Sequence, residues 1–343
     1  MKRFGFGGLV LLGFVVLWSS IACSNGEKAG PPKTVRSGEY FGQEPPGMTA
    51  ELFGEGILST GMYELNAVFF PGGKEVIFSV TTGPMQWALV MAREEGGRWT
   101  EPEVAPFSGR FGGVDPCVSF DGRTVYFCSN RPRSGSGGAE EDYDIWAVTR
   151  VDSGWSEPVN LGQPVNTETH EFYPALTRDG ILYFQSRREG GLGGADIYRA
   201  VPENGRFARV EHLPEPVNSR AFEGDAFISP DESYIIVSTV RRENIGQSDL
   251  YISFKEEDGS WTPMQNLGPE INSPAGENCQ VLSPCGRYLF FTSRRYRGLS
   301  EGVPGSYEAV RKRWADPQNG GGDAYWIDAR FLERFRPEKN EIP

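Results

Sequence analysis

The sequence predicts an all-β protein, a β-propeller of five four-stranded blades whose ring is closed by an N-terminal strand. Three observations carry this prediction. A unit of about fifty residues recurs five times along the chain, a period typical of propellers and other repeat arrays. Each unit contains short strand-like runs separated by turn residues. The strand that the last unit lacks is found near the start of the chain. A six-bladed ring is the alternative.

Each unit contains a tight turn after its first strand-like run. The turn position is occupied, unit by unit, by Gly73, Gly122, Gly180, Glu232 and Gly286. Asp-Gly and similar pairs favour the backbone angles of a hairpin turn. The runs on either side are rich in aromatic and β-branched residues, as in 172–177 and 181–186 of the third unit. Each unit therefore begins with a predicted hairpin.

Two further runs complete each unit. In the third unit they begin at Asp196 and lie around Phe207, and the second and fourth units carry Trp155 and Trp261 at the latter place. Four antiparallel strands of this kind form one propeller blade.

The two ends of the chain predict how the ring closes. The fifth unit supplies a third strand over 323–331 and has no fourth. The segment 52–59 matches the fourth-strand segment 160–167 in spacing and leads into Glu64. We expect this N-terminal segment to complete the last blade, because closure removes the free edges that an open array exposes.

The repeats resemble the WD40-like repeats of the TolB β-propeller family, in particular those of bacterial periplasmic and outer-membrane-associated proteins. The resemblance covers residues 48–335 and rests on the motifs at 155–162, 186–188, 193–198 and 229–231. It implies a propeller in the bacterial envelope. TolB proteins have six blades and an extra N-terminal domain, so the resemblance does not extend to a role in the Tol system. Propellers host many functions.

The N-terminus predicts secretion. Lys2 and Arg3 precede the apolar stretch 4–18, and small residues lead to Cys23, the layout of a secretory signal. A signal that ends on cysteine resembles that of a lipoprotein, so we expect acylation of Cys23 and anchoring at the outer membrane, facing the periplasm. Ordinary cleavage nearby is the alternative, since Ser20 stands where lipoprotein signals carry an aliphatic residue. The expected organisation is a signal over 1–22, a tether over 23–47, the propeller over 48–335 and a tail over 336–343.

Composition narrows the partners. The formal net charge of −12 opposes nucleic acid and anionic lipid surfaces, so we expect no nucleic-acid partner and membrane contact only through the N-terminal lipid. Cys117 and Cys128 lie on the two strands of one predicted hairpin. A bridge between them is strained, and free cysteines are the alternative. Cys279 and Cys285 lie along one extended segment and cannot pair with each other.

Arginine and aspartate recur together in units two to five and are both absent from unit one. This joint pattern predicts that they meet across the loop between the second and third strands, where a guanidinium grips a carboxylate. A ring of arginines for an anionic ligand is the functional alternative. The predicted pairs are Arg131 with Asp144, Arg188 with Asp196, Arg241 with Asp249 and Arg295 with Asp323.

A second repeated charge precedes the innermost strand, as Glu64, Glu171, Glu223 and Glu277. One expectation is a ring of carboxylates at the channel mouth that attracts a cation or a basic peptide. The other is that each glutamate hydrogen-bonds the adjoining loop.

Features that occur in one unit are better functional clues than repeated ones. A long excursion over 296–322 contains the basic Arg311, Lys312 and Arg313 within a predicted short helix, and an insertion over 132–143 is acidic. Long loops on a rigid scaffold commonly carry binding sites. We expect a partner to meet the three basic residues.

Catalytic patterns are weak. The Gly-x-Ser-x-Gly match at 298–302 lacks the strand-turn-helix context of a nucleophile elbow, and the two histidines and scattered cysteines give no metal-ligand spacing. We assign no catalytic residue, metal or cofactor. If the channel holds a sugar-processing site, Asp115 and Asp225 are its candidate carboxylates.

The sequence thus favours a non-catalytic, lipid-anchored envelope propeller that binds or scaffolds a protein, peptide or cell-wall component through its loop-rich face. The alternative is a carbohydrate-active enzyme or a glycan-binding propeller. Two convergent carboxylates with aromatic platforms would favour sugar chemistry, whereas a plugged channel would favour protein binding.

Overall fold

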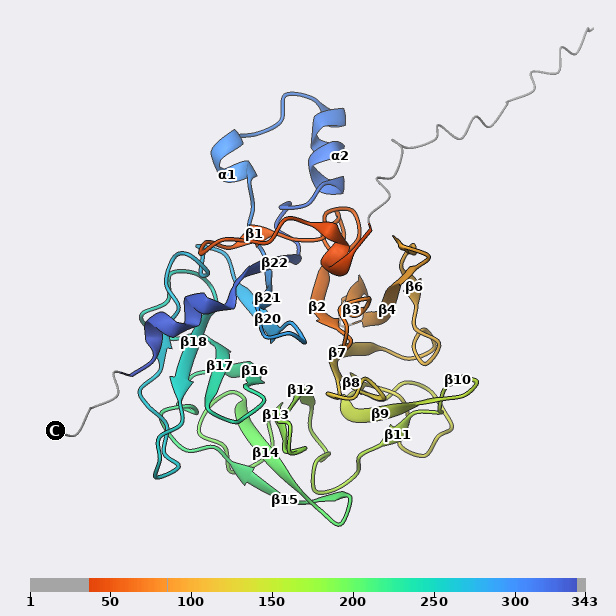
Figure 1. Cartoon of the computed structure of the whole chain (residues 1–343), viewed down its shortest axis with the longest axis vertical. Coiled ribbons are helices and arrows are strands. Elements are labelled where there is room, and N and C mark those ends of the chain that lie inside the picture. The colour runs from red at the N-terminus through yellow and green to blue at the C-terminus, as the bar shows by residue number, and fades with distance from the viewer. Residues whose placement is uncertain (1–36, 85, 338–343) are drawn as a thin grey trace, which may run out of the picture. The chain divides into compact units, whose positions relative to one another are not determined.

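The computed structural model describes residues 37–84 and 86–337. These residues form five antiparallel sheets around a centre (Figure 1), which confirms the five-bladed propeller. Blade 1 contains β2 (Glu64–Phe69), β3 (Glu75–Gly83), β4 (Gln86–Glu95), β5 (Arg98–Trp99) and β6 (Glu103–Val104). Blade 2 contains β7 (Gly113–Val118), β8 (Thr124–Ser129), β9 (Asp144–Val151), β10 (Gly154–Trp155) and β11 (Val159–Asn160). Blade 3 contains β12 (Glu171–Leu176), β13 (Leu182–Ser186), β14 (Asp196–Glu203) and β15 (Arg206–His212). Blade 4 contains β16 (Glu223–Ile228), β17 (Tyr234–Thr239), β18 (Asp249–Phe254) and β19 (Gln265–Asn266). Blade 5 contains β20 (Glu277–Leu282), β21 (Tyr288–Ser293), β22 (Asp323–Asp328) and β1 (Glu51–Leu52).

The ring closes as predicted, through β1. This strand pairs antiparallel with β22, with Glu51 opposite Trp326 and Leu52 opposite Tyr325. After β1, Ser59 accepts the backbone N–H of Ala324 at 2.9 Å, the role that Asn166 plays for Ile145 in blade 2. The closing segment is therefore one residue longer than the matching segment of blade 2.

Apolar side chains fill the space between neighbouring blades. Each of five buried clusters is built largely from the facing sheets of two adjacent blades. Since a middle blade strand is covered on both faces, it reads as a continuous buried run, as β17 and β18 do. At the closing interface Phe53 is fully buried and its ring centre lies 4.5 Å from that of Trp326.

The folded unit begins earlier than predicted. The short helix η1 (Glu39–Gly42) buries Tyr40 and Phe41 in the cluster between blades 5 and 1, and the Trp99 indole donates to the carbonyl of Gly38 at 2.8 Å. The tether expected over 23–47 is thus wrong for its last part, because two large aromatic side chains gain burial there. Cys23 and the signal lie outside the described residues.

Connections at one side of the ring differ from those at the other. The turn face carries the tight turns that join the first and second strands of each blade. The loop face carries the connections from the second to the third strand and those into the next blade. The loop-face excursion of blade 5 contains α1 (Gly298–Glu301) and α2 (Tyr307–Ala315), which Figure 1 shows projecting beyond the strands of the ring. A short helix, η2 (Ala329–Phe335), follows β22.

The four cysteines within the described residues are unbridged. Cys117, Cys128, Cys279 and Cys285 are all free. Cys117 lies opposite Tyr126, while Cys128 lies opposite Val114. None of the helices within 37–84 and 86–337 has the length and apolar character needed to cross a membrane.

Candidate functional site

The repeated arginines turn toward glutamate, so the predicted Arg–Asp clamps are wrong. In blade 3, Arg188 lies 3.2 Å from the Glu171 carboxylate and donates to the carbonyl of Pro164 at 3.1 Å. In blade 4, Arg241 lies 3.4 Å from Glu223. These guanidinium groups bind the loop that enters their own blade and are not presented outward as a ring for an anion. The same holds in blade 5 for Arg295 and Glu277, 3.8 Å apart.

The repeated aspartates instead order the loop before the third strand. Asp249 accepts the backbone N–H groups of Ile245 and Gly246 at 2.6 and 3.0 Å. In blade 2 the longer loop brings Arg133 to Asp144 at 2.6 Å. The aspartate lies three and four residues after the N–H groups that it caps. These groups are close to it along the chain, so the carboxylate accepts from them and does not pair with the more distant arginine. Asp196 and Asp323 also accept backbone N–H groups of their own loops.

The repeated glutamates are buried and are not displayed at a channel mouth. Glu171, Glu223 and Glu277 have no exposed surface. Each accepts the backbone N–H and the hydroxyl of the residue four positions earlier, which is Thr167, Ser219 or Ser273. A cation or basic peptide cannot reach these carboxylates, so the predicted carboxylate ring is wrong. The alternative prediction holds, since each glutamate hydrogen-bonds the adjoining loop. We call the contacts among glutamate, arginine and loop the glutamate–arginine network.

Blades 1 and 2 each hold half of this network. Glu64 in blade 1 accepts from Thr60, has Thr82 in place of an arginine, and leaves its Oε2 buried without a hydrogen-bond partner. Burial raises the pKa of Glu64. Blade 2 has Gly113 in place of glutamate, and burial lowers the pKa of its Arg131 to about 10.

The innermost strands close the central channel. Each strand bulges at one residue with a positive φ: Asn66 (51°), Asp115 (52°), Tyr173 (53°), Asp225 (47°) and Cys279 (54°). Such backbone is uncommon outside glycine, and its recurrence in all five blades shows that the fold requires it there. The Tyr173 hydroxyl donates to the carbonyl of Gln280 at 2.8 Å, and the Asn66 amide donates to that of Pro116 at 3.2 Å. These bonds between blades form a plug, which we define as the five bulge residues and Gln280.

Asp115 and Asp225 both belong to the plug. Burial, and then the Asp225 carboxylate, raise the pKa of Asp115 well above its usual range. Burial also raises the pKa of Asp225 to about 6, against a hydrogen bond from Cys279. Asp115 is only 6% exposed. Neither lines the cleft or the cavity described below.

A cleft of about 1060 Å³ opens on the loop face beside blade 5. Its lining includes three aromatic residues, Tyr63, Tyr296 and Trp314, together with Arg294 and Arg297. Trp314 is 66% exposed and Tyr296 39%. The Arg294 guanidinium lies 5.2 Å from the centre of the Tyr63 ring, in range of a cation–π contact. The cleft therefore combines flat apolar surfaces with cations.

The base of the excursion is firmly attached. The Asn319 amide donates to the carbonyls of Gly61 and Trp314 at 3.0 and 2.9 Å, and Arg297 lies 2.9 Å from Asp316. A Cβ at Gly61 would stand 2.5 Å from the backbone of the helix end, so only glycine allows this approach. The wall of the cleft is thus positioned by the first segment of blade 1.

The predicted basic helix is α2, and its three basic residues differ in environment. Ser306 caps the helix by accepting the backbone N–H of Ala309 at 3.2 Å. Arg313 donates to the carbonyl of Gly302 and lies 3.3 Å from Glu301. Its guanidinium therefore binds other residues of the excursion. Arg311 and Lys312 are exposed.

Sequence reasoning missed the aromatic wall of the cleft. Tyr63 lies far in the sequence from Tyr296 and Trp314, which both belong to the excursion of the fifth unit. The available signal was that large aromatic residues stand next to repeated polar positions, Tyr63 before Glu64 and Tyr296 after Arg295. Only the closed ring brings the two together.

Comparison with known proteins supports the fold. No family model matches the chain, and no curated protein is similar to it. Among solved structures, it is similar to a putative TolB from Agrobacterium tumefaciens, with 16% identity over 68% of this chain and 70% of that one and a TM-score of 0.46. TolB from Acinetobacter baumannii shares 14% identity over 77% of this chain, with a TM-score of 0.44, and the match spans 54% of that protein. A glycoside hydrolase shares 12% identity over 90% of this chain and 94% of its own, with a TM-score of 0.50. At this level of identity, what the comparisons establish is the β-propeller fold.

Proposed function

We propose that this chain is a non-catalytic, lipid-anchored propeller of the bacterial envelope that binds an acidic protein or peptide segment in the loop-face cleft. The observation that carries the proposal is the lining of the cleft, in which exposed Tyr296 and Trp314 stand beside Arg294 and Arg297. Tryptophan, tyrosine and arginine are the residues that most often dominate binding energy at protein interfaces.

The charge around the cleft favours an acidic partner. The chain as a whole is acidic, at −12, yet the cleft contains the exposed Arg294 and the adjoining helix exposes Arg311 and Lys312. A basic patch on an acidic protein steers partners of opposite charge and fixes their orientation.

Anchoring is the second part of the proposal. Its support is the sequence alone, in which a basic start and the apolar stretch 4–18 lead to Cys23. Replacement of Cys23 by alanine should abolish acylation and membrane fractionation while leaving the thermal transition of the propeller unchanged. A Cys23→Ala protein recovered in membranes with unchanged mobility would contradict anchoring.

A glycan is the second candidate ligand. Its support is the acid pair Asp115 and Asp225, close to a loop-face aromatic cluster in which the ring centres of Tyr143 and Phe172 lie 5.3 Å apart. We rank it second because both acids lie in the plug, where a glycosidic bond between them would lack the space that acid and nucleophile or base roles require.

Site-specific photo-crosslinking in intact cells tests the binding face. A photoreactive residue in place of Trp314 should yield adducts, whereas one in place of Val159, an exposed residue on blade 2, should not. Mass spectrometry should place the adduct on an acidic polypeptide segment. Adducts at both positions or at neither, or a glycan adduct at position 314, would defeat the proposal.

Charge removal sharpens the same experiment. Arg311→Ala with Lys312→Ala should lower the adduct yield at position 314 several-fold and reduce its sensitivity to salt, since exposed charges act mainly through steering. Arg123→Ala removes one exposed arginine on the turn face and should leave the yield unchanged.

A further inference from the structure

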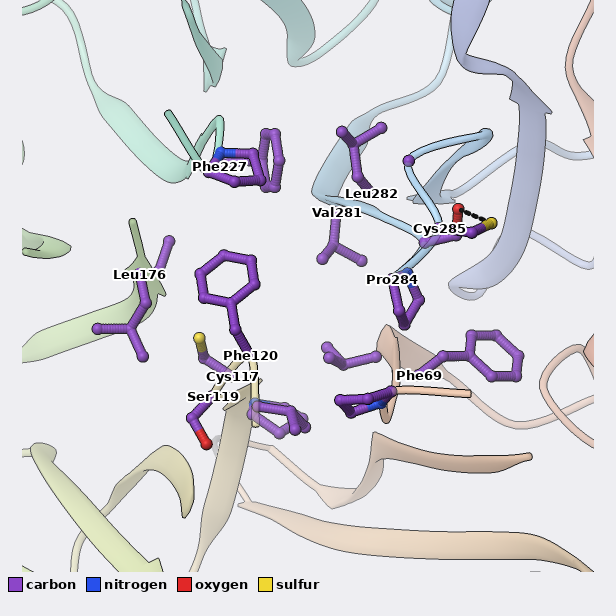
Figure 2. A pocket seen from close by; sticks show the side chains of 18 of the residues that line it. Phe69, Cys117, Ser119, Phe120, Leu176, Phe227, Val281, Leu282, Pro284 and Cys285 are labelled. Atoms are coloured by element: carbon purple, nitrogen blue, oxygen red, sulfur yellow. Dashed lines mark hydrogen bonds between the residues drawn. The ribbon is translucent and has the colours of Figure 1, made fainter. Parts of the chain in front are cut away.

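A second, separate hollow lies at the other end of the plug. On the turn face a cavity of about 510 Å³ enters the mouth of the channel, a size typical of small-molecule sites. Figure 2 shows side chains from different blades around it, among them Phe120, Leu176, Phe227 and Val281. Its walls are therefore mostly hydrocarbon.

Among the residues on the floor of this cavity, Gln280 alone has a buried side-chain polar atom without a hydrogen-bond partner, its Oε1. Asn66, Tyr173 and Gln280 of the plug line it. The Tyr173 hydroxyl already donates to the Gln280 carbonyl at 2.8 Å, and the Asn66 amide already donates to Pro116 at 3.2 Å. A peptide backbone placed here would lose water from its N–H and carbonyl groups with little to replace it, which is costly. A hydrocarbon chain has no such groups.

The rim carries a cation. Arg178 lines the cavity and is exposed. Its guanidinium carbon lies 5.8 Å from the centre of the half-exposed Phe120 ring, and its backbone N–H donates to Pro230 at 2.8 Å. No salt bridge joins Arg178 to another residue of the described chain. The acid on the same rim, Glu39, lies 3.7 Å from Arg287.

We propose that the turn-face cavity binds a single-chain anionic amphiphile, with its hydrocarbon chain against Phe120, Leu176 and Phe227 and its head group paired with Arg178. The apolar walls select the chain, and the unpaired guanidinium at the rim selects a head group of opposite charge. This site is distinct from the loop-face cleft and takes a different class of ligand.

The start of the folded chain places this rim near a source of such ligands. Glu39 and Tyr40 line the cavity, and the 15 residues between Cys23 and Glu39 can span at most about 54 Å. With Cys23 acylated, as proposed above, the cavity is held within reach of the membrane surface. This supporting argument rests on the anchoring proposal, whereas the lining and the rim charge do not.

Cys285 supplies a native reporter for occupancy. It lines the cavity and is exposed. Partial burial raises the pKa of this thiol, but hydrogen bonds from Arg287, Ser283 and Tyr40 outweigh burial and bring it to about 7. It should therefore react with a thiol reagent at pH 7.5. Cys117, also in the cavity, should react far more slowly, because burial raises its pKa to about 12.

The test uses the full-length chain with Cys23→Ala, which removes the anchor and a competing thiol and so separates this proposal from the anchoring proposal. Dodecanoate below its micelle concentration should slow Cys285 modification at least five-fold and should bind with one site by calorimetry. Absence of both effects would overturn the proposal, as would equal protection by an acidic peptide in place of dodecanoate.

Two variants locate the ligand. Arg178→Ala should weaken dodecanoate about ten-fold and leave dodecanol binding unchanged, because the lost contact is with the charged head group. Leu176→Trp fills the cavity and should abolish binding of both probes, whereas Val240→Trp, on an exposed loop-face residue, should not. Unchanged dodecanoate affinity in Arg178→Ala, or in a Leu176→Trp protein with a normal melting transition, would show that the amphiphile binds elsewhere.

Discussion

Blades 3, 4 and 5 differ from blades 1 and 2 in one set of buried contacts, the glutamate–arginine network. The first group contains the complete glutamate–arginine network, as in Glu223 with Arg241. Blade 1 keeps the glutamate without the arginine, and blade 2 keeps the arginine without the glutamate. All five blades nevertheless pair their first three strands in the same antiparallel order. Strand pairing therefore does not need the network, which instead ties each blade to the loop that enters it.

The two incomplete blades make aromatic contacts of their own. Blade 1 is covered by the N-terminal segment, where the ring centres of Phe41 and Trp99 lie 4.3 Å apart. In blade 2 the Arg131 guanidinium carbon lies 5.3 Å from the centre of the Trp146 ring. The arginine of a complete blade makes the same kind of contact, as Arg188 does with the Tyr198 ring at 4.8 Å. Blade 2 therefore lacks the ion pair alone, and a buried ion pair costs desolvation on both sides.

The largest expected effect follows from breaking a complete network. Glu223→Ala leaves the Ser219 N–H without its acceptor and the partly buried Arg241 without its carboxylate partner, so we expect a loss of about 3 kcal/mol of unfolding free energy. Chemical denaturation checks it. The matched variant Glu64→Gln, in a blade without the arginine, should cost less than about 1 kcal/mol. Equal losses in the two variants would remove the distinction between the blades.

A smaller effect on the unfolding free energy, which depends on pH, is expected from Asp323 in blade 5, near the incomplete blade 1. Burial raises the pKa of Asp323 to about 7, against the hydrogen bond from the Gln318 N–H and with a further rise from the Glu64 carboxylate. Since this pKa lies above that of the unfolded chain, the folded state retains a proton that the unfolded state releases. Stability from this group is complete below about pH 4 and is lost as the pH rises through 7.

Asp323→Asn should consequently raise the unfolding free energy by about 2 kcal/mol at pH 8 and leave it unchanged near pH 4. Denaturant titrations at the two pH values measure the difference. Asp249→Asn in blade 4 is the control, because that carboxylate accepts three hydrogen bonds, from Ile245, Gly246 and Asn266, and its loss should destabilise. A pH-independent effect of Asp323→Asn would contradict the assignment.

The smallest expected effect comes from completing the network in blade 1. Thr82 stands two residues after the strand position opposite Glu64, as Arg188 does relative to Glu171. Thr82→Arg should stabilise the protein by at most about 1 kcal/mol at pH 8, and this gain should vanish in a Glu64→Gln background. A double-mutant cycle measures the coupling, and a gain that survives Glu64→Gln would show that the new arginine acts elsewhere.

Repetition in the sequence was sufficient for the architecture. The turn glycines, the period and the displaced strand near Leu52 predicted five blades and their closure, because strand alternation and turn chemistry are local properties that each unit repeats. The same repetition misled about side-chain partners. Arg188 and Asp196 recur together, but joint occurrence does not distinguish a mutual contact from two separate ones, here Arg188 with Glu171 and Asp196 with the backbone N–H of Gly193 in its own loop.

The tertiary structure alone decided the sites. Ring closure brings Tyr63 and Tyr296 into the lining of the same loop-face cleft. The bulges of the five inner strands place Asp115 and Asp225 together in the plug. The turn-face cavity likewise depends on side chains from separate blades, among them Phe120 and Phe227. Cavity shape, burial and pKa are properties of the space between blades. A single unit does not contain that space, so its sequence carries no local signal for it.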